Sequence, residues 1–211
     1  MKIGIIGAGN VGGTLGKAWA AKGHAVVYGV RNPTDAKTTE LLKATGHGAR
    51  AASPAEATTA GEVIVFATPW PATEAAVKSA GNLKGKIVID CTNPLKPDLS
   101  GLEIGHTTSA AEMVAGWAAG AKVFKAFNTT GATVMADPVI AGTRTVMFIC
   151  GDDEAAKPTV LKLAADVGFD AVDAGKLAQA RLLEPWAVLW IHLALRGGLG
   201  PNFGFALLRR K

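Results

Sequence analysis

The sequence predicts an α/β fold: a Rossmann-type, doubly wound and mainly parallel sheet with a small, mostly helical C-terminal part. Short β-branched segments recur along residues 1–150, and Ala-rich segments of helical periodicity separate several of them. A glycine-rich turn lies between the first such strand and the first helix. The chain of 211 residues is also 49% hydrophobic and only 18% charged, which allows a large core and excludes intrinsic disorder.

The expected strands are apolar on both faces, as are strands of a parallel sheet that helices cover on both sides. They lie at residues 2–6, 25–30, 63–67, 86–90, 122–127 and 145–150. The expected helices between them lie at residues 11–21, 36–44, 54–60, 71–80 and 109–118. Because crossovers between parallel strands are right-handed, this alternation builds a doubly wound sheet.

The pattern changes after Cys150. Acidic residues at 152–154 suit the N-terminus of a helix, which we expect to end at Gly168. A short strand, a long helix and a glycine-rich end follow at residues 169–173, 177–196 and 197–201. We therefore expect two parts, a Rossmann domain at residues 1–143 and a small domain at residues 144–211 that packs on it.

Composition and charge exclude several classes of protein. The net charge of +5 is spread evenly, with no basic stripe, so we expect no nucleic-acid partner. The apolar stretch at residues 186–195 is too short to span a bilayer, and the N-terminus does not resemble a signal peptide, so we expect no membrane contact. Cys91 and Cys150 form neither a disulfide framework nor a metal motif, and a cytoplasmic location is the default.

The strongest motif is the turn Gly7-Ala8-Gly9-Asn10-Val11-Gly12, directly after a strand and directly before a helix. Gly7 permits the tight turn, Gly9 lets the backbone approach a pyrophosphate, and Gly12 lets helix and strand pack closely. The free N–H groups of the helix N-terminus then face the phosphates. The motif predicts a dinucleotide site; the alternative is a glycine-rich turn without a ligand.

The end of the second strand indicates which dinucleotide binds. An NAD site places Asp or Glu there for the ribose hydroxyls, but this chain has Arg31 and Asn32. A guanidinium fits a 2′-phosphate bidentately and stacks on adenine. These two residues therefore favour NADP(H), with a solvated arginine at a strand end as the alternative.

The sequence offers little acid–base machinery. Tyr28 is the only tyrosine, the four histidines are scattered, and no cluster has zinc spacing. We therefore expect no metal and no catalytic proton donor. Hydride transfer between a nicotinamide and a flavin-like ring needs neither, because the rings carry the chemistry and the protein orients them.

Small polar residues beside Pro or Gly follow each of the later strands, where Rossmann ligands bind. This shape suits backbone contact with a flat ring, although ordinary turn chemistry is the alternative. The candidate cofactor contacts are Ala67, Thr68, Pro69, Asn93, Thr130 and Ala132. The candidate substrate contacts are Trp70, Asn128, Gly198 and Leu199.

At these residues the chain resembles the NADP-dependent oxidoreductases of the coenzyme F420 (8-hydroxy-5-deazaflavin) type. Besides the glycine turn and the Arg31 strand end, the resemblance covers the segments 67–70, 93–95, 106–115, 122–132, 150–153, 172–177 and 180–184. It runs in order from residue 1 to about residue 208.

The resemblance implies a protein, often dimeric, that holds NADP(H) on its Rossmann part. The deazaflavin lies in a cleft that the C-terminal part closes, and that part also forms the dimer interface. Thr68 and Pro69 would line the nicotinamide, and Thr130 and Ala132 would flank the ring. Enzymes of this type tend to carry His where this chain has Asn128, and a related domain of membrane metalloreductases reduces flavin, so either ring is an expected acceptor.

Two other functions stay open at this point. An imine or hydroxyacid reductase opens with a similar glycine turn, but normally needs a longer helical C-terminal domain than this chain offers. A non-catalytic NADPH sensor would carry the same cofactor site, and turnover with any acceptor would exclude it.

Replacing Arg31 with Glu tests the choice of cofactor. We expect the wild-type protein to bind NADPH roughly tenfold to a hundredfold more tightly than NADH, because charge-assisted hydrogen bonds to the 2′-phosphate are strong, and Arg31→Glu to abolish the difference. Dissociation constants for both dinucleotides measure it. Equal wild-type affinities would contradict the prediction.

Overall fold

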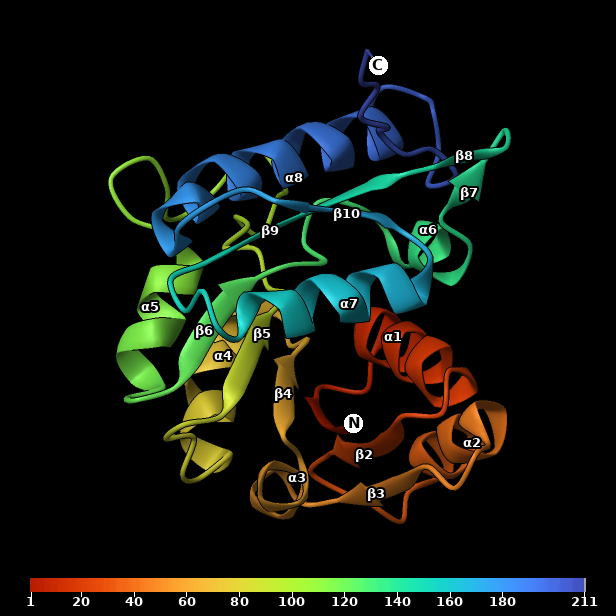
Figure 1. Cartoon of the computed structure of the whole chain (residues 1–211), viewed down its shortest axis with the longest axis vertical. Helices are drawn as coiled ribbons and strands as arrows, with labels where there is room; N and C mark the ends of the chain where they lie inside the picture. The colour runs from red at the N-terminus through yellow and green to blue at the C-terminus, as the bar shows by residue number, and fades with distance from the viewer. Residues whose placement is uncertain (211) are drawn as a thin grey trace.

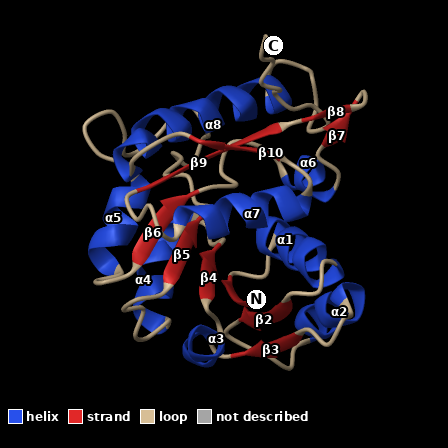
Figure 2. Cartoon of the chain, viewed as in Figure 1, coloured by secondary structure: helices blue, strands red, loops and turns tan. Residues whose placement is uncertain are grey.

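The main strands of the chain join one eight-stranded sheet, in the spatial order β10-β9-β6-β5-β4-β1-β2-β3 (Figure 1 and Figure 2). The structure, a computed structural model, describes residues 1–210. The strands are β1 (Lys2–Ile6), β2 (Ala25–Gly29), β3 (Arg50–Ala52), β4 (Val63–Phe66), β5 (Ile87–Asp90), β6 (Lys122–Lys125), β9 (Val146–Gly151) and β10 (Asp170–Asp173). A separate hairpin pairs β7 (Val139–Ile140) with β8 (Thr143–Arg144).

Helices connect the strands and cover both faces of the sheet (Figure 2). They are α1 (Asn10–Ala21), α2 (Ala36–Thr45), α3 (Pro54–Ala60), α4 (Trp70–Ser79), α5 (Ala110–Trp117), α6 (Ala132–Ala136), α7 (Lys157–Val167) and α8 (Ala180–Leu195), with a 3₁₀ turn η1 (Leu177–Gln179) before α8. Of the helices in residues 1–210, none has both the length and the apolar character that a membrane span requires.

Strand pairing confirms the predicted fold class. The six strands from β3 to β6 pair in parallel in Rossmann order, so their carboxyl ends lie along one edge of the sheet. At β1 the direction of winding reverses, since β2 follows on one side and β4 on the other. On the far side β9 joins β6 in antiparallel pairing, and β10 pairs parallel to β9.

Alternating strand residues serve two separate cores, one on each face of the sheet. On β1, Ile3 and Ile5 pack with α1 and α7, whereas Ile6 packs on the opposite face with α3 and α4. Both sets are fully or almost fully buried. This arrangement explains why the strands carry apolar residues at nearly every position.

The expected C-terminal part continues the sheet of the first part. Its strands β9 and β10 extend the same sheet, and α7 packs beside α1, where Trp19 Nε1 donates to the carbonyl oxygen of Leu163 at 2.9 Å. His24 Nε2 also lies 3.1 Å from Asp166 Oδ2. The parts therefore share a sheet and a core, and the division at residue 143 stays a prediction.

Several elements differ from the sequence-based expectation, and one of them is the hairpin of β7 and β8, which was not expected. Helix α7 begins at Lys157, because Asp153 accepts from the N–H of Ala156 at 2.8 Å and so holds the preceding turn outside the helix. Strand β3 was not expected, since its residues are not β-branched; pairing with β2 at the sheet edge forms it. The short helix α6 follows Gly131 and was also not expected.

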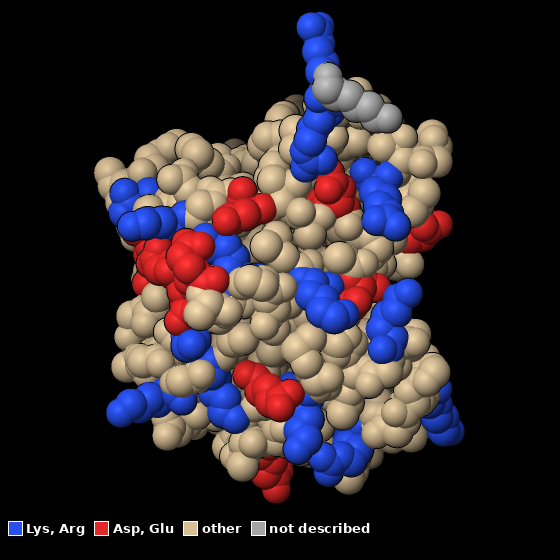
Figure 3. Space-filling model, viewed as in Figure 1, with Lys and Arg blue, Asp and Glu red and all other residues tan. Residues whose placement is uncertain are grey.

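On the face in Figure 3, basic and acidic side chains are interspersed over the surface.

The C-terminal segment folds back across the sheet: the carbonyl oxygen of Phe205 accepts from the N–H of Val146 at 2.8 Å. Phe203 stacks on Trp190 of α8, with the ring centroids 5.3 Å apart.

Candidate active site

The glycine turn between β1 and α1 has the geometry that a dinucleotide site requires. Gly7 has φ +104°, and a Cβ there would lie 2.6 Å from the carbonyl oxygen of Ala67. A Cβ on Gly12 would overlap with the carbonyl oxygen of Gly7. A Cβ on Gly9 would meet no atom of residues 1–210 within 4 Å, so the turn is open above Gly9. Two of these glycines are required by the fold, and the third leaves open space.

The N-terminus of α1 has no side-chain cap and no acidic residue in its first turn. Its first N–H groups have no partner inside the helix, and the helix dipole makes them favourable to an anion. The arrangement fits a pyrophosphate above Gly9, held by the N–H groups around Ala8, Asn10 and Val11. These contacts stay a prediction.

Arg31 follows the last residue of β2 by two positions and is exposed. Within residues 1–210 its guanidinium takes part in none of the hydrogen bonds or ion pairs of the structure. Asp35, the nearest acid along the chain, caps α2 by accepting from the N–H of Thr38 at 2.7 Å, and its pKa lies below the usual value for that reason. Asn32 accepts from Thr34 and shapes the loop. Arg31 is thus free to meet a phosphate.

The residues that follow β4 are engaged with helix α4. Thr68 Oγ1 lies 3.0 Å from Thr73 Oγ1, and Pro69 is the residue that precedes α4. The ring of Trp70 stacks on Trp117 of α5, with the centroids 5.6 Å apart. The Trp70 side chain therefore packs between helices, and its contact with a substrate stays a prediction.

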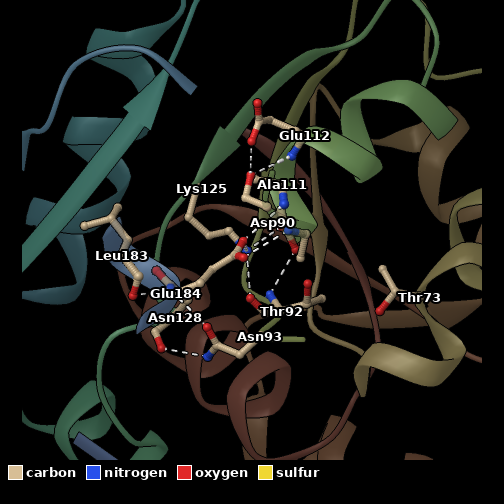
Figure 4. A network of polar contacts seen from close by, with 12 residues as sticks. Thr73, Asp90, Thr92, Asn93, Ala111, Glu112, Lys125, Asn128, Leu183 and Glu184 are labelled. Carbon is tan, nitrogen blue, oxygen red and sulfur yellow. Dashed lines mark hydrogen bonds and ion pairs between the residues drawn. The ribbon is translucent and has the colours of Figure 1, made fainter. Parts of the chain in front are cut away.

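Asn93 and Asn128 follow β5 and β6 and bind each other (Figure 4). Asn93 Nδ2 donates to the carbonyl oxygen of Asn128 at 2.9 Å, and Asn128 Nδ2 donates to Asn93 Oδ1 at 3.1 Å. Asn128 Nδ2 also donates to the carbonyl oxygen of Leu183 in α8 at 3.2 Å. Phe127 has φ +59°, a strained conformation for a bulky residue. This residue directly precedes Asn128 of the amide pair.

Three buried polar atoms near the pair have no hydrogen-bond partner in the part of the chain that the structure describes. They are Asn128 Oδ1, Thr92 Oγ1 and Thr130 Oγ1. Buried polar groups are seldom left unpaired, so unpaired atoms beside a predicted site fit a ligand that supplies the partners. Thr130 also lines a small cavity with Phe148 and Trp186.

A buried ion triad, which sequence reasoning missed, lies next to the amide pair, above it in Figure 4. Lys125 Nζ lies 2.6 Å from Asp90 Oδ2 and 2.8 Å from Glu184 Oε1, and all three side chains are 0% exposed. Burial by itself would lower the pKa of Lys125, but the two carboxylates outweigh it and raise the pKa, so the ammonium stays charged. Burial raises the pKa of Glu184, against the attraction of Lys125. The available signal was a lysine, Lys125, between the apolar residues Phe124 and Ala126.

The glycine-rich end lies between two other loops of this region. Arg196 Nη2 donates to the carbonyl oxygen of Asp98 at 3.0 Å, and Thr133 Oγ1 of α6 donates to that of Pro201 at 2.7 Å. Gly198 has φ +76° and, with Leu199, is exposed between these contacts. Ala132 begins α6.

The tyrosine and both cysteines are buried, whereas His47, His106 and His192 are exposed. Burial raises the pKa of Tyr28, whose Oη lies 3.0 Å from Thr45 Oγ1 beneath α1. Burial also raises the pKa of the Cys150 thiol to about 12, and that of Cys91 still higher. The His, Cys, Asp and Glu side chains of residues 1–210 form no group of three that could hold a metal ion.

Comparison with known proteins identifies similar chains. The model of the family described as NADP oxidoreductase coenzyme F420-dependent matches residues 2–94. The F420-dependent NADP reductase of Methanocaldococcus jannaschii is 30% identical to this chain, and the match covers 93% of each of the two chains. The metalloreductase STEAP3 of Rattus norvegicus is 34% identical over 87% of this chain, but the match spans only 36% of that longer protein.

Solved structures give the same picture. A protein of Arthrobacter sp. FB24, described provisionally as an F420-dependent NADP reductase, has a TM-score of 0.89 and 34% identity, over 99% of this chain and 100% of that one. An imine reductase of Myxococcus stipitatus in complex with NADP⁺ has a TM-score of 0.70 at 19% identity and covers 94% of this chain and 64% of its own, which shows a shared fold.

Substituting two glycines of the turn separates folding from binding. Gly9→Ala is expected to change the free energy of unfolding by no more than about 1 kcal/mol. It should raise the dissociation constant for NADPH at least roughly tenfold, because its Cβ enters the open space above the turn. Gly12→Ala is expected to destabilise the fold by about 1–3 kcal/mol through overlap with Gly7. Chemical denaturation and NADPH titration measure both effects; unchanged NADPH affinity in Gly9→Ala would rule out a phosphate at this turn.

Proposed function

The chain belongs to the family of coenzyme F420-dependent NADP oxidoreductases, and from that premise we propose that it transfers a hydride directly between NADP(H) and a flavin-like ring. The acceptor is a deazaflavin such as F420, or a flavin. The observation that carries the proposal is the pair of strand-end features on one edge of the sheet: an open, uncapped phosphate turn after β1 and a locked amide pair after β5 and β6.

The cofactor side of the proposal rests on backbone groups and one side chain. The turn from Gly7 to Gly12 holds the pyrophosphate, and Arg31 pairs with the 2′-phosphate of NADP(H). Thr68 and Pro69 line the nicotinamide, on the loop after β4. When bound, NADP(H) supplies or takes up the hydride.

The acceptor side rests on the loops after β5 and β6. Asn93 and Asn128 orient the ring edge, while Thr130 and Ala132 flank the ring. Trp70, Gly198 and Leu199 complete the cleft, which the C-terminal part of the chain closes. The protein's contribution is to hold two rings in contact and to exclude water, so that catalysis comes from proximity and orientation.

The burial of Tyr28, Cys91 and Cys150 supports a reaction that uses none of these three side chains as nucleophile or acid. Two free thiols also fit the reducing cytoplasm. The match to the F420-dependent NADP reductase of Methanocaldococcus jannaschii covers nearly its whole length, which supports a similar reaction for this chain. STEAP3 is a much longer protein, and the match covers only 36% of it.

We further propose that the enzyme is a homodimer that uses α8. Leu182, Trp186 and Leu189 follow one another at helical spacing on α8 and are exposed. Exposed apolar side chains at such spacing are typical of an interface. A second copy of the chain would cover them.

A panel of hydride acceptors tests the reaction. With NADPH as donor, stopped-flow absorbance is expected to show oxidation by F420, FMN, FAD or riboflavin, with saturation in at least one of them. Gly9→Ala serves as the matched control and should need more NADPH for the same rate. If no ring acceptor oxidises NADPH while the cofactor still binds, the imine reductase and sensor functions take precedence.

Sedimentation equilibrium tests the dimer. The wild-type chain is expected to sediment at twice its monomer mass, and Leu189→Lys, which places a charge in the apolar stripe, should sediment as a monomer. Leu207→Lys, at another exposed leucine outside α8, is the control. A wild-type monomer at all concentrations would contradict the proposal.

A further inference from the structure

Burying the ion triad of Asp90, Lys125 and Glu184 in the core carries a large desolvation penalty. The free energy lost by removing three charged groups from water offsets much of the free energy gained from their mutual attraction. Apolar side chains of the same volume would stabilise the core as well or better. The value of the triad therefore lies in the geometry that it imposes: an ammonium between two carboxylates holds its neighbours at defined distances and directions.

The triad is in register with the amide pair. Asp90 and Lys125 are direct partners across β5 and β6. Asn93 lies three residues after Asp90, and Asn128 lies three residues after Lys125. Between the two levels, Lys125 Nζ donates to the carbonyl oxygen of Thr92 at 2.7 Å, and the N–H of Thr92 donates to Asp90 Oδ1 at 2.9 Å. Thr92 is thus held from both sides immediately before Asn93.

The third member, Glu184, connects α8 to the same level. Besides Lys125 it accepts from the N–H groups of Ala110 and Ala111 at the start of α5, at 3.0 and 3.2 Å. Its neighbour Leu183 provides the carbonyl oxygen that accepts from Asn128 Nδ2. The ion pair with Lys125 therefore sets the distance from α8 to β6 that this hydrogen bond needs.

We propose that Asp90, Lys125 and Glu184 are positioning residues, which hold the Asn93–Asn128 pair and its two strand-end loops in the arrangement that binds the acceptor ring. The proposal rests on the proposed function for the identity of the ring, but not for the positioning itself. Once Asn128 Nδ2 has both its acceptors, Oδ1 is the group that is left to accept a hydrogen bond. Unpartnered Thr92 and Thr130 hydroxyls lie on the same loops.

Glu184→Gln tests the triad with little change of shape. The amide oxygen of Gln keeps only one of the two acceptor positions that face α5, and the NH2 group faces a donor at the other. Lys125 keeps Asp90 as its counter-ion, so a folded but less stable protein is expected. We expect the KM for FMN, or for F420 if FMN is not reduced, to rise roughly fivefold to tenfold, as when one or two hydrogen bonds are lost, with the dissociation constant for NADPH within about twofold.

Glu112→Gln is the matched control. Glu112 also joins α5 to α8, through Arg181 Nη2 at 2.6 Å, but it does not contact the amide pair or its loops in residues 1–210. It should lower the melting temperature while leaving the acceptor KM unchanged. If the two variants raise the KM equally, the triad stabilises the interface only and the proposal fails.

A second measurement needs no turnover. In the ligand-free protein, the side-chain amide protons of Asn128 are expected to exchange slowly with water, because Nδ2 donates twice and is buried. Nuclear magnetic resonance should find this exchange at least roughly tenfold faster in Glu184→Gln and unchanged in Glu112→Gln. Should Glu184→Gln fail to fold, Glu184→Asp keeps the charge, shortens the reach and is expected to give the same result.

The two measurements test the two proposals independently of each other. If no ring oxidises NADPH in the wild-type protein, the proposed function is wrong, yet amide exchange still decides whether the triad holds Asn128. If exchange in Glu184→Gln equals that of the wild type, the positioning proposal is overturned, whatever the acceptor.

Discussion

Parallel pairing of the strands from β3 to β6 is the constraint on which the rest of this structure depends. Parallel hydrogen bonding in register leaves every carboxyl end on one edge, and each connection must therefore begin there. The phosphate turn, Arg31, the Thr68 loop and the two asparagine loops are consequences of that single arrangement. Residues as far apart as Ile3 and Val63 meet because their strands are neighbours in the sheet.

The two sides of the site use different physical means. On the cofactor side, space is made by removing atoms: Gly7 and Gly12 allow β1 and α1 to approach, and the helix supplies N–H groups. On the proposed acceptor side, buried charges and side-chain amides bind one another. Lys125 ties β6 to Asp90 and to Glu184, so that polar groups far from water hold a defined geometry.

The C-terminal part of the chain takes part in both the sheet and the site. It adds β9 and β10 to the sheet edge and packs α7 on α1, so that it shares the main core. Its helix α8 reaches the acceptor side with Leu183 and Glu184, and Trp190 packs against Gly131, where a Cβ would overlap with the indole. The change in sequence pattern after Cys150 therefore falls within one sheet and one core.

The sequence by itself determined the fold class, most strands, the glycine turn and the strand ends at which polar residues gather, because hydrophobic periodicity and glycine requirements are local. Tertiary structure alone decided the rest. Strand β3 forms only because it pairs with β2, and Trp70 packs on Trp117 of another helix. Asp90, Lys125 and Glu184 form one triad, although 94 positions separate the first from the last. No local pattern predicts such contacts, since buried charges find their partners only when packed elements bring them together.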